Sequence, residues 1–321
     1  MKGRFVMKQP IFLSPVFQER IWGGTKLRTE FGYDIDSELT GECWAVSAHP
    51  NGQSVVKNGP YQGKTLGALW SAHRELFGNL EGEAFPLLTK ILDANNDLSV
   101  QVHPNDEYAN AHENGELGKT ECWYVIDCEE DAEIIFGHNA HTKEQFVEMV
   151  KKGEWSDLLR RVKVKSGDFF YVPSGTIHAL CSGVLILETQ QSSDTTYRVY
   201  DYDRVDQNGN KRALHLEKSI DVTTVPHVDV AVRPATQSRR GATITTFVEA
   251  RYFSVYKWAI TAPASFTVDK PFLIASVIKG SGHIRTQEGG FPVYKGDHFI
   301  LPNGVGDFEM DGNIELIVSH P

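Results

Sequence analysis

Cysteine is scarce in this chain of 321 residues, which contains only Cys43, Cys122, Cys128 and Cys181. None of the four stands in CxxC spacing, and so low a density is unlike that of small secreted domains held together by disulfides. The segment 1–10 also lacks the apolar core of a signal peptide. We therefore expect reduced, mostly buried thiols in a cytoplasmic protein.

Long apolar runs and blocks of positive charge are missing as well. The longest apolar runs, at 184–187 and 272–278, have the length of strands, whereas a helix needs about 18 apolar residues to span a bilayer. The 32 Lys and Arg residues are outnumbered by 42 Asp and Glu residues, which gives a net charge of −10. This acidity disfavours nucleic acid and anionic membranes as partners. A small anionic substrate is still compatible with it, because a few cationic side chains can converge locally.

The chain does contain many short β-branched and aromatic segments, which are separated by Gly, Asn and Asp turns. Two stretches, residues 65–77 and 142–162, instead space their apolar residues at helical intervals. The second stretch begins with Thr142 and Gln145 in capping-box spacing and contains Gly153, which we expect to divide it into two helices. The pattern predicts a mainly β fold with inserted helices.

One sequence pattern, G-D-x-F-x-x-P-x-G-x-x-[HD], occurs at residues 167–178 and again, without a gap, at 296–307. The repeat predicts two related jelly-roll β-barrels on either side of the stretch 222–241. The first, in residues 1–225, carries the two helical insertions, and the second occupies residues 240–321. The copies end differently, on His178 and on Asp307. We therefore expect the first barrel to carry the chemistry and the second to be a degenerate barrel without the histidine.

The first copy fits the second sequence motif of the cupin superfamily, in which the closing histidine is a metal ligand; here it is His178. Gln101 and His103 are two residues apart in a predicted strand, so their side chains point to the same face. Glu121 begins the next predicted strand. Two imidazoles and a carboxylate, with a fourth oxygen donor, suit Zn²⁺ or another borderline divalent ion.

Several separated segments together resemble the type I mannose-6-phosphate isomerase family. They are Leu98–Asp106, Lys119–Trp123, Gly175–Leu180 and Gln191–Asp201, and Ile21–Leu27 near the N-terminus is similar to that family too. The resemblance runs from about residue 10 to the end, in the short bacterial form without the long helical insertion of larger relatives. It implies one Zn²⁺ per chain, bound by Gln101, His103, Glu121 and His178.

The same resemblance implies the residues that act on the substrate. The family's catalytic arginine corresponds to Arg198, its motif lysine to Lys119 and its active-site glutamate to Glu188. Arg204 stands where longer relatives have a further basic residue, most often lysine. The implied reaction interconverts mannose 6-phosphate and fructose 6-phosphate by moving a proton between C1 and C2 through a metal-stabilised enediol.

The roles of these side chains follow from that chemistry. Glu188 is our first choice of base, because a buried carboxylate can have a raised pKa. Lys119 is the second choice, as an acid/base partner or as a phosphate contact. Arg198 and Arg204 would hold the phosphate or the developing enediolate, for which the planar guanidinium is well suited.

Two other functions are compatible with the residues. Two histidines and one carboxylate can also hold Fe²⁺, as in an iron-dependent cupin oxygenase. A non-catalytic sugar-binding cupin is the second alternative, although the first barrel retains every metal ligand. The expected partner is a small sugar phosphate, and we expect a monomer by default, with a dimer as the alternative.

Overall fold

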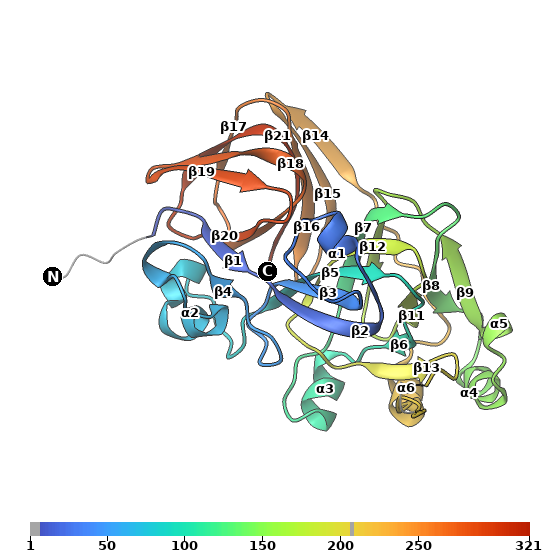
Figure 1. Ribbon diagram of the computed structural model, residues 1–321. Helices are drawn as coiled ribbons and strands as arrows, with labels where there is room; N and C mark the ends of the chain where they lie inside the picture. Colours follow the sequence, from blue (N-terminus) through green and yellow to red (C-terminus); the bar gives the residue numbers. More distant parts are fainter. Residues whose placement is uncertain (1–6, 206–208) are drawn as a thin grey trace.

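Residues 7–205 and 209–321 form a mainly β structure with short inserted helices in a computed structural model (Figure 1). The strands of these residues belong to three open sheets. The four cysteines are free thiols, of which Cys43, Cys122 and Cys181 are buried. None of the helices in these two ranges is long and apolar enough to cross a membrane.

Two antiparallel sheets form the first cupin unit. The larger one has the order β10-β7-β12-β5-β3-β2, and its strands are β2 (Val16–Gly24), β3 (Thr40–Val46), β5 (Leu87–Ala94), β7 (Glu121–Cys128), β10 (Phe169–Val172) and β12 (Val184–Gln191). The smaller one has the order β13-β6-β11-β8-β9, with β6 (Val100–Val102), β8 (Glu133–His138), β9 (Leu159–Lys163), β11 (His178–Leu180) and β13 (Tyr197–Tyr200). One apolar cluster contains residues of both sheets, among them Ile186 and Leu180, so the sheets pack face to face.

The third sheet forms the second cupin unit and curls around its own apolar core (Figure 1). Its main path is β14-β15-β16-β21-β18-β20-β1-β4, while β17 pairs with β21 and β19 with β18. The strands are β14 (Ala235–Arg239), β15 (Ala242–Glu249), β16 (Ser254–Ile260), β17 (Ala264–Thr267), β18 (Phe272–Thr286), β19 (Gly289–Tyr294), β20 (His298–Pro302) and β21 (Asp307–His320), together with β1 (Ile11–Ser14) and β4 (Val55–Val56).

The helices are short. They are α1 (Lys26–Thr29), α2 (Leu66–Ala72), α3 (Asp106–His112), α4 (Lys143–Lys152), α5 (Trp155–Leu158) and α6 (Leu216–Val222), with 3-10 turns η1 (Gly59–Tyr61) and η2 (Arg74–Phe77). The helical prediction for 65–77 is confirmed by α2 and η2. Gly153 separates α4 from α5 as predicted, with a left-handed φ of 68°.

The capping box predicted at the start of α4 is present in part. The Thr142 side chain accepts a hydrogen bond from the Gln145 backbone N–H, at 3.2 Å. The Gln145 side chain accepts a hydrogen bond from the backbone N–H of His141, at 2.8 Å, instead of from that of the N-cap residue Thr142.

The helical prediction for 142–162 is wrong at its end. Residues 159–162 belong to β9, where Val162 pairs with Ile134 of β8. Leu158, Leu159 and Val162 fit a helical spacing, but the intervening Arg160 and Arg161 allow the partly alternating burial of an edge strand. Pairing with β8 therefore overrides the local helical pattern.

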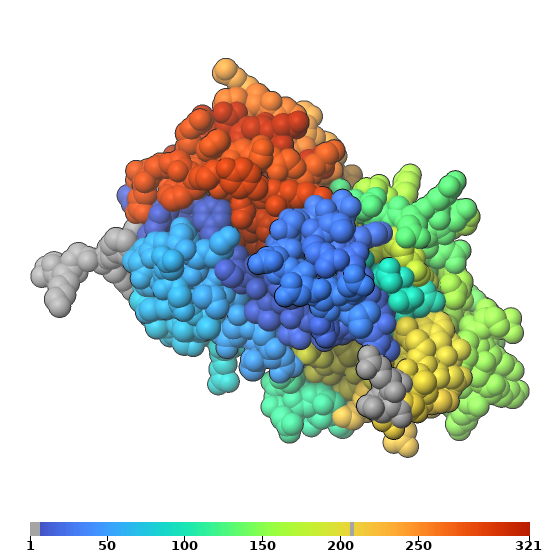
Figure 2. Space-filling view, in the orientation of Figure 1, coloured from blue at the N-terminus to red at the C-terminus, as the bar shows by residue number. Residues whose placement is uncertain are grey.

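The division of the chain into residues 1–225 and 240–321 stays a prediction, and the sheet pairing shows that the two parts are interlocked. β1 and β4 pair along the edge of the C-terminal sheet, where Ile11 lies opposite Ile300. A single apolar cluster includes Trp70 and Leu87 as well as Phe272 and Ile317. In the space-filling view, blue N-terminal residues lie between the orange and red C-terminal unit and the green and yellow residues of the first unit (Figure 2).

Candidate metal centre and active site

Three buried side chains converge between the two sheets of the first unit. Glu121 begins β7, His178 begins β11, and His103 follows β6 directly. The Nε2 atom of His103 lies 3.5 Å from one Glu121 carboxylate oxygen, and the Nε2 atom of His178 lies 3.4 Å from the other. One ligand atom from each of the three residues can be chosen so that all three lie within 4.8 Å of one another, which is the arrangement of a metal-binding cluster.

The second nitrogen of each ring fixes its tautomer. Nδ1 of His103 lies 2.9 Å from the Thr195 carbonyl, and Nδ1 of His178 lies 2.8 Å from the Thr176 carbonyl. A carbonyl only accepts hydrogen bonds, so each Nδ1 must carry the proton and each Nε2 presents a lone pair toward Glu121. Burial lowers the pKa of both imidazoles, that of His178 to about 4. Both rings are therefore neutral near pH 7, as metal ligands must be.

The cluster fits a divalent cation because it leaves buried acceptor atoms without donors. Among the described residues, Glu121 Oε1 and His178 Nε2 have no hydrogen-bond partner. Such atoms are costly to bury unless a cation or a donor compensates them. Gln101 lies opposite His178 in the pairing of β6 with β11, and it also lines the adjoining cavity. The predicted ligands Gln101, His103, Glu121 and His178 are thus brought together.

The cavity beside this cluster has a volume of about 270 Å³. Of the predicted site residues, Gln101, Lys119, Glu188 and Arg198 line it. The remaining lining residues are Arg20, Trp22, Glu42, Lys90, Leu92, Leu98, Ser99, Asp194, Thr196 and Arg212. The space is large enough for a monosaccharide, and its walls are mostly polar or charged.

Glu188 lies in the middle of β12 and is buried. Its Oε2 accepts a hydrogen bond from Trp123 Nε1 at 3.1 Å, while its Oε1 lies 4.0 Å from the Lys90 ammonium and has no hydrogen-bond partner in the described part of the chain. Burial, followed by the negative charge of Glu121, raises the pKa of Glu188. A carboxylate with a raised pKa and one free oxygen can both accept and return a proton.

Lys119 stands next to the cluster. Its ammonium nitrogen lies 2.8 Å from Glu121 Oε2 and 3.2 Å from His103 Nε2. Burial disfavours the charged form, but Glu121 and Glu188 outweigh burial and raise the pKa of Lys119. In this arrangement Lys119 is a cation and a proton donor rather than a free base.

The arginines occupy different places. Arg198 lines the cavity, and its guanidinium donates to Ser99 Oγ at 3.3 Å and to the Ala213 carbonyl at 2.8 Å. Arg204 is not among the lining residues; it pairs with Asp201 at 2.5 Å and donates to the Asp97 carbonyl.

Arg212, which the sequence analysis missed, lines the cavity and also binds Asp201. Its Nε and Nη2 atoms donate to the two Asp201 oxygens at 2.7 and 2.6 Å. Nothing in its local sequence identifies it, since it follows a Gly- and Asn-containing turn as many exposed arginines do.

Lys90 and Glu42 are also functional candidates that the sequence analysis missed. The buried Lys90 ammonium lies 3.7 Å from Glu42, 4.0 Å from Asp194 and 4.6 Å above the Trp44 ring. Burial favours the neutral acid at Glu42, yet Lys90 and Arg20 lower its pKa to about 2. A lysine inside the apolar run 87–94 is an unusual residue for a buried strand, and that signal could have identified it.

Comparison with known proteins gives a consistent result. The family model described as the type I phosphomannose isomerase catalytic domain matches residues 11–127, and that of the mannose-6-phosphate isomerase cupin domain matches residues 243–321. Mannose-6-phosphate isomerase ManA of Bacillus subtilis (strain 168) is 61% identical over 312 residues, covering 97% of this chain and 99% of that protein.

Solved structures agree on the fold. The crystal structure of the mannose 6-phosphate isomerase from Bacillus subtilis superimposes with a TM-score of 0.96 at 60% identity, over 97% of this chain and 99% of that one. A mannose 6-phosphate isomerase structure described as zinc-bound has a TM-score of 0.79 at 15% identity, over 97% and 99% of the two chains, and shows the shared fold. The predicted cupin-type β fold is thereby confirmed, and the chain belongs to the type I mannose-6-phosphate isomerase family.

Proposed function

We propose that this protein interconverts mannose 6-phosphate and fructose 6-phosphate with one Zn²⁺ per chain, bound by Gln101, His103, Glu121 and His178. The observation that carries the proposal is the buried His103–Glu121–His178 cluster with its free acceptor atoms, which Lys119 connects to a cavity lined by Lys119 itself and by Glu188. Family membership supports the same reaction and favours it over the iron-dependent oxygenase and the non-catalytic sugar-binding protein.

The charges around the cavity support a phosphorylated sugar as the substrate. Five lining residues are cationic and three are acidic, so the lining has a net positive charge, whereas the whole chain has a net negative charge. Arg198 and Arg212 offer planar guanidinium groups, which match the geometry of a phosphate. Arg204 contributes by sharing Asp201 with Arg212, which holds the Arg212 side chain in place.

Glu188 transfers the proton between the two carbon atoms. When bound, Zn²⁺ supplies a Lewis acid that stabilises negative charge on the sugar oxygens at C1 and C2. Glu188 takes the proton from C2 of mannose 6-phosphate and returns it to C1, while the hydroxyl proton of the C2 oxygen moves to the C1 oxygen through the enediol, which yields fructose 6-phosphate. Trp123 fixes one carboxylate oxygen and leaves the other free for the proton. Lys119 places a positive charge and a transferable proton beside the sugar oxygens at C1 and C2.

The direct test is turnover. Purified full-length protein is incubated with mannose 6-phosphate before and after treatment with a chelator, and fructose 6-phosphate is measured with a coupled enzyme assay. We expect product before chelation, its loss after chelation, and recovery when Zn²⁺ is returned. No product from zinc-loaded protein contradicts the isomerase, whereas turnover that survives complete metal removal contradicts only the metal mechanism.

The two arginines next to Asp201 give a second prediction. Arg212→Gln is expected to raise KM for mannose 6-phosphate by about 10- to 100-fold, because it removes a charge-assisted contact to the phosphate. Arg204→Gln should raise KM less, since Arg204 acts through Asp201. Initial rates over a range of substrate concentrations measure both. A larger KM effect for Arg204→Gln than for Arg212→Gln contradicts this placement.

The monomeric state and the cytoplasmic location stay predictions. A charged cavity of about 270 Å³ supports a small sugar phosphate as the partner.

A further inference from the structure

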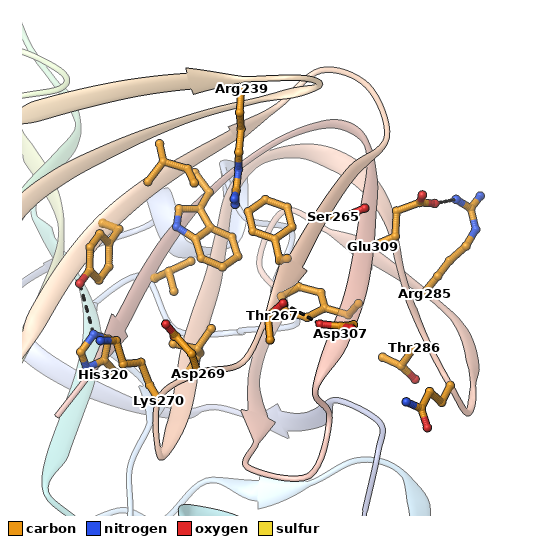
Figure 3. Close-up of a pocket in the computed structure, with 18 residues that line it drawn as sticks. Arg239, Ser265, Thr267, Asp269, Lys270, Arg285, Thr286, Asp307, Glu309 and His320 are labelled. Carbon is orange, nitrogen blue, oxygen red and sulfur yellow. Dashed lines mark hydrogen bonds and ion pairs between the residues drawn. The ribbon is translucent and has the colours of Figure 1, made fainter.

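The second cupin unit contains a larger cavity than the first. Its volume is about 910 Å³, and it opens between the strands of the C-terminal sheet (Figure 3). Its size is in the range of sites for small organic ligands. Neither the metal cluster nor Glu188 is part of its lining, so it is separate from the proposed active site.

Sheet register places this cavity where the first unit has its metal centre. In the repeat, His178 corresponds to Asp307. His178 pairs with Gln101 of β6, and in the second unit Asp307 pairs with Thr267 of β17. Thr267 therefore takes the place of Gln101. Both Asp307 and Thr267 line the larger cavity, and Thr267 donates a hydrogen bond to Asp307 at 2.6 Å (Figure 3).

The acidic ligand is lost in the second unit. In the first unit Val172 pairs with Glu121, and its repeat counterpart Leu301 pairs with Leu273. Leu273 therefore occupies the position of Glu121, and it lines the larger cavity. A leucine cannot bind a metal, so this second cavity holds no equivalent of the zinc site.

The proposed base Glu188 and its strand partner Lys90 are replaced as well. Glu188 pairs with Lys90 in the first unit, and by the same register Val318 pairs with Tyr256 in the second. Both Val318 and Tyr256 line the larger cavity. The second unit has thus kept the cavity while it has lost the groups that would perform chemistry there.

One charge is retained without its partner. Arg20 of β2 forms an ion pair with Glu42 at 2.9 Å. In the second unit Ile244 takes the place of Glu42, and Arg239 of β14 lies two residues after Gln237, the partner of Ile244, as Arg20 lies two residues after Gln18, the partner of Glu42. The Arg239 guanidinium makes no hydrogen bond or ion pair within residues 7–205 and 209–321, and instead lies 4.2 Å above the Phe266 ring (Figure 3).

Aromatic rings line the space beside Arg239. Trp258 and Phe266 are stacked with ring centroids 4.4 Å apart, and Phe308 is nearly parallel to Phe266 at 5.4 Å. Lys270 is a second lining cation with no ion pair among the described side chains, whereas Arg285 is neutralised by Glu309 at 2.7 Å. A small molecule with a ring and a phosphate group matches both the aromatic side chains and the unpaired guanidinium. Its ring can contact the aromatic side chains, and its phosphate can pair with Arg239.

We propose that the cavity of the second cupin unit is a binding site for a small organic phosphate with a ring, held by Arg239 against Trp258 and Phe266 without metal and without turnover. A sugar phosphate and a nucleotide share this chemistry. The two sources are distinguished by the probes used below.

The test is isothermal titration calorimetry on the full-length zinc-loaded protein with Glu188→Gln, which suppresses turnover. The probes are mannose 6-phosphate, adenosine 5′-monophosphate and inorganic phosphate. We expect at least one of the two ring compounds to bind at the second cavity, so that mannose 6-phosphate gives two sites per chain or adenosine 5′-monophosphate gives one. Inorganic phosphate, which lacks the ring, should bind there at least about 10-fold more weakly.

Matched variants locate the site. Arg239→Gln should weaken the additional binding event by about 10- to 100-fold, whereas Arg285→Gln, whose charge is already paired, should change it little. Arg239→Gln in the otherwise native chain should leave isomerase activity unchanged, and its thermal unfolding is measured as a control for folding. Absence of any additional binding event, or an event that Arg239→Gln does not weaken in a folded protein, overturns the proposal.

Discussion

Replacing His178 with alanine is expected to abolish zinc binding and to lower kcat at least about 1000-fold. His178 is one of two buried imidazoles directed at Glu121, and its Nε2 has no hydrogen-bond partner among the described residues. Without it, the proposed ligands that are left are one imidazole, one carboxylate and the neutral Gln101 amide, a donor set too weak for a stable zinc site. Metal content after dialysis and steady-state rates measure the two effects.

Asp307→Ala is the matched control for zinc binding. Asp307 occupies the repeat position of His178, but its neighbours Thr267 and Leu273 offer no imidazole or carboxylate. The zinc content of Asp307→Ala should therefore equal that of the native chain. Equal zinc loss in the two variants contradicts the assignment of the metal to the first unit alone.

The second large effect is expected for Glu188→Gln, which should lower kcat by about 100- to 10,000-fold and leave the zinc content unchanged. Glutamine has nearly the same shape and can still accept the Trp123 hydrogen bond, but it cannot take up the proton. A loss of kcat without loss of metal therefore separates proton transfer from metal binding.

The pH dependence of the native enzyme follows from the same residue. Burial and Glu121 raise the pKa of Glu188 above its ordinary value, and the base must be ionised to act. Activity should therefore fall as pH decreases through this raised pKa, and log(kcat/KM) against pH should show an acid limb of slope one. The limb should be absent from the residual activity of Glu188→Gln. If Glu188→Gln is nearly fully active and Lys119→Met is not, the base is Lys119.

The metal cluster could be predicted because its signals are local. The spacing of Gln101 and His103 places both on one face of a strand, and the repeat motif places His178 at a strand start. Glu121 begins β7, which pairs with β10. The Pro-x-Gly corner that follows β10 leads directly to His178, so Glu121 and His178 lie close together. Strand periodicity and a recognisable turn place these residues, whereas their selection as metal ligands rests on the resemblance to the cupin motif and to the isomerase family.

The rest of the cavity depends on contacts that local patterns do not encode. Lys90 and Glu42 meet because β5 pairs with β3, and no feature of either segment specifies that pairing. Arg212 and Arg204 both bind Asp201, and only the path of the chain after β13 decides which one reaches the cavity. The helical prediction for residues 159–162 was wrong for the same reason, because these residues pair with β8, a strand distant from them in the sequence.

The pairing of β1 with β20 also determines when the protein can finish folding. Ile11 leaves the ribosome long before Ile300, its partner, has been synthesised. The C-terminal sheet therefore cannot be completed during translation, and the edge of β20 is covered only after nearly the whole chain is available. A C-terminal fragment made alone exposes that edge to other chains, so the N-terminal strand also serves to block intermolecular sheet formation.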